Sequence, residues 1–367
     1  MKKFILTILF LFMSLITVFA ESETTVLPSQ IGKVISVEYA ETEIENINQT
    51  KQIAQVKILN GIAKNQMIIV DNILTGNPYY DIKLKSGMKV ILHVEESDYE
   101  LFYSIQDVYR SGILIFLSVL FCVLLVCVGR KKGLYSLVSI IITCLMIAHV
   151  LSPMILNGIN PIIATIIICL LSTAVTIYLV GGFNNKSSSA VLGCTLSITF
   201  AGLLAFFTTK FAHLNGFINE NVLFLYSAQP QLNFVAIVIS TIILATLGAV
   251  MDVAMSIAST INEIYEVDST KSVKELFISG MNVGRDIIGT MANTLILVYL
   301  GSSLPLILLA NNIDLQKFFN LNQVVTEISS ALIGSCAIVI CVPITALVSS
   351  NWVKKTKPQI DISNIQV

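Results

Sequence analysis

Two aspartates, Asp252 and Asp286, are the residues whose type and position could do chemistry in this sequence, because each lies in or beside a long apolar stretch. Asp252 follows an unbroken apolar run that begins at Phe234. An ionisable side chain inside a membrane is costly, which makes it a candidate functional residue. Two carboxylates at similar depth could bind a cation or a proton.

Small and polar residues surround both aspartates at helical spacing. In the first segment, one helix face carries Ala245, Gly248, Asp252, Ser256, Ser259 and Glu263. In the second, one face carries Asn282, Asp286, Thr290 and Asn293. We therefore predict an ion or proton site between the fifth and sixth predicted membrane spans, residues 232–258 and 286–310. The site would be formed by Asp252, Asp286, Arg285, Asn282, Asn293, Ser256 and Thr290. The open alternative is a structural Asp252–Arg285 clamp at the membrane boundary, with the polar stripes serving only helix packing.

The connection between these segments has its own signals. Ser272-Val-Lys-Glu275 matches a capping box, which predicts a helix start. Val273, Leu276, Phe277 and Gly280 then give an apolar face, as in a short amphipathic helix on a membrane surface.

The composition predicts a membrane environment for the helices that position these residues. Of 367 residues, 55% are hydrophobic and 12% are charged, and the mean hydropathy is +0.82. A soluble protein has about a quarter charged residues. Seven apolar stretches are long enough to cross a bilayer as helices: 112–129, 134–152, 161–181, 188–209, 232–258, 286–310 and 328–350.

The N-terminal part differs in character. Residues 1–20 carry Lys2 and Lys3 before an apolar run, the pattern of a signal peptide, with an uncleaved N-terminal anchor as the alternative. Residues 21–108 are polar and contain short stretches in which apolar and polar residues alternate, separated by turn residues. This pattern predicts a small β-rich domain, for which an OB-like fold is one alternative. The expected fold is an all-α polytopic membrane protein with seven transmembrane helices (109–353), this extracytoplasmic β-domain and a tail (354–367).

Basic residues predict the orientation. If the β-domain lies outside, ten basic residues fall inside: Arg130, Lys131, Lys132, Lys186, Lys271, Lys274, Arg285, Lys354, Lys355 and Lys357. The outer loops between spans carry only Lys210 and Lys317. Since cytoplasmic loops are enriched in Lys and Arg, we expect the C-terminus to be cytoplasmic.

The sequence predicts no cofactor and no metal site. The seven cysteines all lie in apolar runs, without the spacing of a metal or redox motif. The net charge of −1 does not favour nucleic acid as a partner. The lipid bilayer is the expected partner, and the oligomeric state is left undetermined.

The segments Gly248–Thr260 and Ser279–Tyr299, followed by Gly301-Ser-Ser-Leu-Pro305, resemble the signature segments of the YibE/F family of bacterial multi-pass membrane proteins. The order of leader, small outer domain and spans is also similar to that family. The resemblance implies the cytoplasmic membrane of a bacterium. It implies no established substrate, cofactor or reaction, and no catalytic residues to transfer.

Three functions remain open. The first is a secondary transporter or channel. The second is a non-transporting membrane component whose residues 21–108 bind an envelope partner or ligand. The least favoured is an intramembrane aspartyl-type enzyme, because Arg285 beside Asp286 would keep a carboxylate ionised, which opposes a shared-proton pair.

Overall fold

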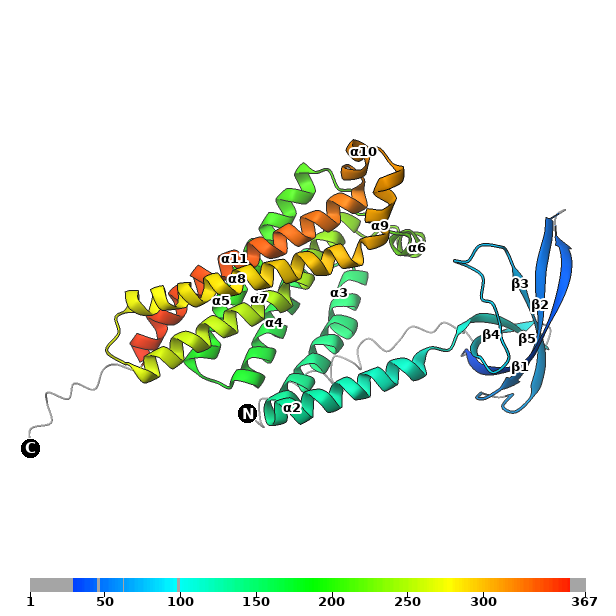
Figure 1. Cartoon of the computed structure of the whole chain (residues 1–367), viewed down its shortest axis with the longest axis horizontal. Coiled ribbons are helices and arrows are strands. Elements are labelled where there is room, and N and C mark those ends of the chain that lie inside the picture. Colours follow the sequence, from blue (N-terminus) through cyan, green and yellow to red (C-terminus); the bar gives the residue numbers. More distant parts are fainter. Residues whose placement is uncertain (1–28, 45–46, 62, 98–99, 357–367) are drawn as a thin grey trace, which may run out of the picture. The chain divides into compact units, whose positions relative to one another are not determined.

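The computed structural model describes residues 29–44, 47–61, 63–97 and 100–356 (Figure 1). The predicted signal segment, residues 1–20, lies outside the described residues, as does the tail from residue 357 onward. The chain divides into two compact units, one ending at Leu124 and the other continuing from Leu125. Each unit is described by itself.

The first unit contains one antiparallel sheet of five strands. The strands are β1 (Gln30–Ile44), β2 (Ile47–Ile58), β3 (Met67–Leu74), β4 (Lys89–Ser97) and β5 (Glu100–Val108). Their order in the sheet is β3-β2-β1-β4-β5, so the long β1 pairs with both β2 and β4. The end strands β3 and β5 also lie against each other, which curls the sheet.

A buried apolar cluster fills the concave side of this sheet, because alternate residues of each strand point to one face. The cluster includes Val34, Val56, Val90 and Leu92, none of them exposed. Gln52 is buried among them and is fully bonded: its Oε1 accepts from the Leu84 amide at 2.9 Å, and its Nε2 donates to the Leu84 carbonyl at 3.2 Å. This pairing ties the segment before β4 to β2.

The rest of the described chain is helical. The long helices are α2 (Ser111–Met146), α4 (Pro161–Gly181), α5 (Asn185–Phe211), α7 (Phe234–Val267), α8 (Val273–Ser302) and α11 (Asn322–Thr356). The short ones are the π-helix η1 (Ile147–Leu151), α3 (Ser152–Leu156), α6 (Glu220–Ala228), α9 (Leu304–Leu309), the 3₁₀-helix η2 (Ala310–Asn312) and α10 (Leu315–Phe319).

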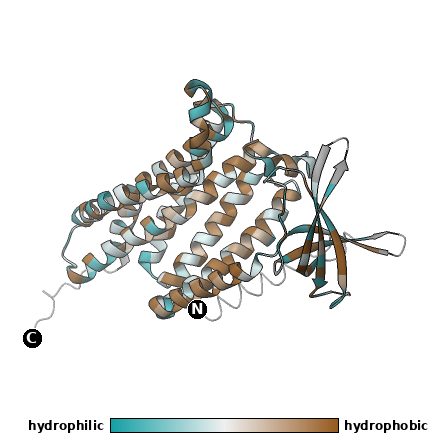
Figure 2. Cartoon of the chain, turned by 45° about the vertical axis from the view of Figure 1, so that its right-hand side comes forward, coloured by the Kyte–Doolittle hydropathy of each residue, from teal (hydrophilic) through white to brown (hydrophobic). Residues whose placement is uncertain are grey.

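Six helices in the described part are long and apolar enough to cross a membrane. Figure 2 shows hydrophobic residues along most of their length. The first of them runs from Ser111 to Leu156 and holds two of the seven predicted spans. Arg130 interrupts it with a left-handed backbone (φ 49°, ψ −130°). A Cβ on Gly133 would lie 2.1 Å from the Leu125 carbonyl oxygen, so the chain reverses tightly here. Seven separate crossings stay a prediction.

The core of the second unit lies where α5, α7 and α11 pack together, with α4 and α8 against them. Small residues allow this close packing, as is usual for helices in lipid. A Cβ on Gly193 of α5 would lie 2.1 Å from the Thr345 hydroxyl oxygen of α11.

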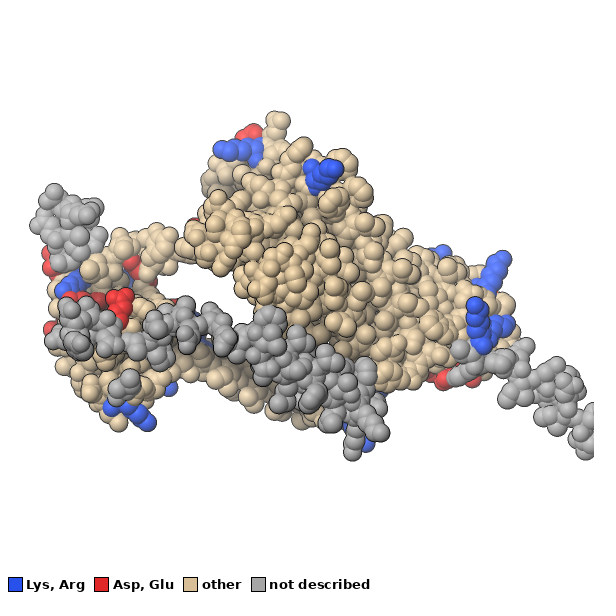
Figure 3. All heavy atoms as spheres, turned by 180° about the vertical axis from the view of Figure 1, so that it is seen from behind, with Lys and Arg blue, Asp and Glu red and all other residues tan. Residues whose placement is uncertain are grey.

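Hydrogen bonds fix the two ends of this bundle. At one end, Lys354 Nζ of α11 donates to the Lys271 carbonyl in the α7–α8 turn at 3.1 Å. At the other, Asn322 Nδ2 donates to Asn215 Oδ1 and to the Phe217 carbonyl. On the face seen in Figure 3, charged side chains gather toward the ends of the helical unit and leave the surface between them uncharged.

Candidate functional site

The polar stripe of α7 is exposed along the helix. Asn233 starts the helix by accepting a hydrogen bond from the Ala236 amide at 3.0 Å. Residues of the apolar face, such as Val250 and Ile257, are completely buried. Asp252 and Ser256 lie on the opposite face and are exposed. The predicted helical periodicity therefore holds, and the carboxylate points away from the packed core.

The predicted capping box starts α8. Ser272 Oγ accepts from the Glu275 amide at 3.2 Å, and the Ser272 amide donates to Glu275 Oε2 at 2.7 Å. The amphipathic segment expected here forms the first turns of α8, which continues without interruption to Ser302. Thirty residues of helix measure about 45 Å, more than the roughly 30 Å of hydrocarbon. Arg285, which lies just before the predicted span 286–310, is inside this helix.

Two glycines of α8 approach α11 and α7 closely. A Cβ on Gly284 would lie 2.2 Å from Val342 Cγ1, and one on Gly280 would lie 2.6 Å from Ile261 Cδ1. The rest of the helix is largely uncovered. The predicted polar residues Asn282, Arg285, Asp286, Thr290 and Asn293 are all exposed. Both polar stripes thus lie on outward faces of adjacent helices.

The contact between Gly280 and Ile261 sets the levels along this antiparallel pair. Asp286 lies six residues beyond Gly280, which places it level with residue 255 of α7. Asp252 is three residues further, so the two aspartates differ in level by about 5 Å, one helical turn. The two carboxylates therefore lie at similar levels along the adjacent helices. Whether they form one ion site stays a prediction.

A neutral side chain partners Arg285 on α8. Arg285 Nη1 donates to Asn282 Oδ1 at 2.9 Å. The Thr290 hydroxyl donates to the Ile287 carbonyl at 3.1 Å, which leaves its oxygen lone pairs available. The ion pairs found among the described residues are Lys51–Asp71, His93–Glu95 and Asp107–Arg110. The Asp252–Arg285 clamp is therefore not formed within this part of the chain.

The turn between α7 and α8 contains a carboxylate held by its own loop. The Thr270 hydroxyl donates to Asp268 Oδ1 at 2.5 Å, and the Thr270 amide donates to the same oxygen at 3.0 Å. These bonds, with the nearby charge of Lys271, lower the pKa of Asp268. The ionised Asp268 carboxylate thus stabilises the turn by accepting both hydrogen bonds from Thr270.

Glu327 of the helical unit was not predicted as a site residue. Glu327 was placed just before the last span, but α11 begins at Asn322 and carries Glu327 in its second turn. The apolar residues Val324 and Ile328, spaced by one turn, could have extended the predicted helix backward. Glu327 is half-buried and lines an apolar cavity.

Six membrane-length helices that follow a small antiparallel sheet in the sequence define a multi-pass membrane protein. A family model described as YibE/F-like protein matches residues 117–355, and one described as the YibE/F family N-terminal domain matches residues 27–108. The chain belongs to the YibE/F family. No curated protein and no solved structure matches it.

Proposed function

We propose that the protein is a secondary transporter or channel that moves a cation or protons along the polar faces of α7 and α8. The observation that supports this is that Asp252 and Asp286 lie at similar levels along adjacent membrane-length helices, both exposed on the surface of the single chain. A carboxylate facing hydrocarbon is costly. This face would therefore line water or a second protein surface in the membrane.

The neighbouring side chains suit this role. Ser256, Thr290 and Asn293 present hydroxyl and amide oxygens beside the carboxylates, the ligand types that hard cations prefer. Arg285, bonded to Asn282, would set the electrostatic potential at the mouth of the path.

The topology that goes with this proposal has seven crossings, with the β-domain outside and the C-terminus in the cytoplasm of a bacterium. The reversal at Arg130 supports two crossings in the first long helix, since Arg130, Lys131 and Lys132 then face the cytoplasm. Domain boundaries near 20, 108 and 353 follow from the same topology. The strand order, with β3 against β5, supports an OB-like fold for the outer domain.

The test is to record currents from reconstituted liposomes on a solid-supported membrane, under pH jumps and with a panel of cations. We expect a transient current with the native chain and its loss in Asp252→Asn and Asp286→Asn. Glu220→Gln is the control, because Glu220 is an exposed carboxylate in α6, outside the polar faces of α7 and α8.

An electroneutral exchange gives no current, so a pH-sensitive dye inside the same liposomes completes the measurement. Absence of both current and dye response under every gradient would contradict the transport proposal. So would full activity in both aspartate variants.

A second function is favoured by one feature of the outer domain. The edge strand β3 exposes Met67, Ile69 and Ile73 on one face, while Val70 and Leu74 fill the core. Exposed apolar rows on an edge strand favour association. In this alternative, residues 21–108 bind an envelope partner. Photocrosslinking from position 69 in intact cells should then give an adduct of discrete mass, which Ile73→Asp abolishes.

A further inference from the structure

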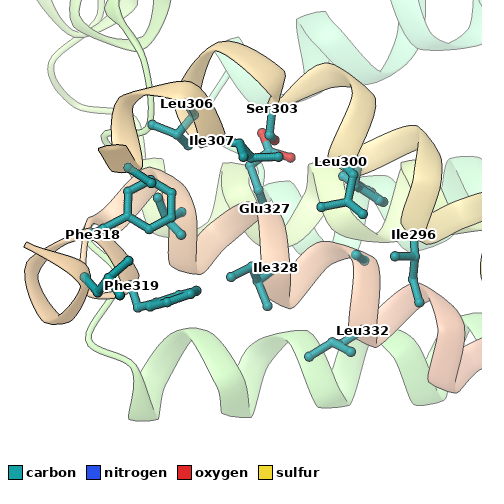
Figure 4. A pocket seen from close by; sticks show the side chains of 15 residues that line it. Ile296, Leu300, Ser303, Leu306, Ile307, Phe318, Phe319, Glu327, Ile328 and Leu332 are labelled. Carbon is teal, nitrogen blue, oxygen red and sulfur yellow. The ribbon is translucent and has the colours of Figure 1, made fainter. Parts of the chain in front are cut away.

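A cavity of about 430 Å³ lies between the end of α8, α9, α10 and the start of α11. Its walls are almost entirely apolar, and among them are Ile296, Leu300, Phe318, Phe319, Ile328 and Leu332 (Figure 4). The volume is within the range of small-molecule sites in proteins. The cavity lies near the opposite end of the bundle from the α7–α8 turn.

Among the described residues that line this cavity, Glu327 is the only charged one. Figure 4 shows it extending from α11 toward Ser303. None of the ion pairs found in the described part of the chain includes it. Tyr299 and Ser303 supply hydroxyl groups to the same wall. A half-buried carboxylate in apolar surroundings is costly unless a positive charge partners it.

The end of α8 and an aromatic pair form further parts of the cavity wall. The thirty-residue α8 ends at Ser302, and Ser303 donates its amide to the Tyr299 carbonyl at 3.0 Å. The rings of Phe318 and Phe319, 5.4 Å apart and edge to face, supply aromatic surface on which a cation can rest.

We propose that this cavity binds an amphiphilic organic cation, with its apolar body among the aliphatic and aromatic walls and its charge against Glu327. Such a ligand would match the cavity in polarity and in charge. The apolar walls would favour its apolar body, and the Glu327 carboxylate would favour a positive charge over a neutral lipid chain. The site is independent of the proposed ion path, because Ser303 lies about 25 Å along α8 from Asp286.

The test measures equilibrium binding of radiolabelled tetraphenylphosphonium to the full chain in phosphatidylcholine nanodiscs, with empty nanodiscs subtracted. We expect saturable binding at one site per chain. Glu327→Gln should weaken it by about tenfold or more, as expected for loss of one charge contact. Glu327→Asp, which keeps the charge, should retain most of the affinity. Glu220→Gln is the control, an exposed carboxylate in α6.

Two further measurements locate the site and identify its occupant. Ala331→Leu adds volume to the cavity wall with the carboxylate intact, and we expect it to weaken binding while the melting temperature shows a folded protein. The neutral triphenylphosphine oxide should compete poorly. Equal binding of the neutral compound, unchanged binding in folded Glu327→Gln, or a co-purified phospholipid that the cation does not displace would each overturn the proposal.

Discussion

Helices α7 and α8 are neighbours joined by a short turn, but they differ in how much of their surface is buried. More than half of the apolar stretch of α7 is buried, whereas almost none of that of α8 is buried. α7 packs against α4, α5, α8 and α11, while α8 packs mainly against α11 and α7. α8 is also the least apolar of the six membrane-length helices.

The buried faces of these two helices serve packing, whereas the exposed polar faces carry the candidate functional residues. In α7, much of the helix surface is packed in the chain's own core, and the stripe with Asp252 remains open. In α8, a single edge with Gly280 and Gly284 makes close contact, and the polar remainder is uncovered. Changes on the packed faces should therefore affect folding, and changes on the open faces should affect function.

The largest expected effect is loss of the contact between α8 and α11. In Gly284→Leu the new side chain would collide with Val342, so we expect at least about 3 kcal/mol of destabilisation, the upper range for overpacking. Gly289→Leu is the matched control, since nothing lies within 4 Å of a Cβ at Gly289. Thermal unfolding in one detergent compares the two. Similar melting temperatures would show that the glycine contact does not hold α8.

The next effect tests the buried face of α7. Ile257→Ala should destabilise the bundle by about 3 kcal/mol, because removing a fully buried aliphatic side chain leaves a cavity. Ile278→Ala on α8, where the side chain is 46% exposed, should change stability by less than about 0.5 kcal/mol. Chemical denaturation in mixed micelles gives both values. A larger loss at position 278 would reverse the comparison.

A smaller and local effect is expected at the start of α8. Ser272→Ala removes the side chain that accepts from the Glu275 amide and should cost about 1 kcal/mol. We expect faster hydrogen exchange in the first turn of α8, measured by mass spectrometry, with α7 unchanged. Ser279→Ala, within the helix, serves as control. Equal exchange in Ser272→Ala and the native chain would argue against the cap.

The smallest effect concerns pH in the α7–α8 turn. Hydrogen bonds from Thr270 lower the pKa of Asp268. The Asp268 carboxylate therefore binds a proton more weakly in the folded turn than in the unfolded chain. The stabilisation is therefore present at neutral pH and is lost as pH falls through the lowered pKa. The pH dependence of exchange at the Thr270 amide measures this. In Thr270→Val the loss should be complete at a higher pH, and an unshifted profile would contradict the assignment.

Local signals were enough to predict several elements. The predicted span 161–181 coincides with α4, and in the structure Asn160 caps the helix start while Gly182 follows its end. The capping box at Ser272 and Glu275 was predicted from residue types three positions apart. The polar stripes of α7 and α8 followed from helical periodicity alone. Each of these depends on backbone geometry over a few neighbouring residues.

The tertiary structure decided the direction in which those stripes point. Periodicity shows that Asn282, Asp286 and Asn293 share a face, but only the contacts of Gly280 and Gly284 with distant Ile261 and Val342 turn that face outward. The cavity at Glu327 likewise needs α8, α9, α10 and α11 together. Sequence determines which residues share a helix face, because that depends on local geometry. Which face is buried depends on the packing free energy between segments far apart in the chain.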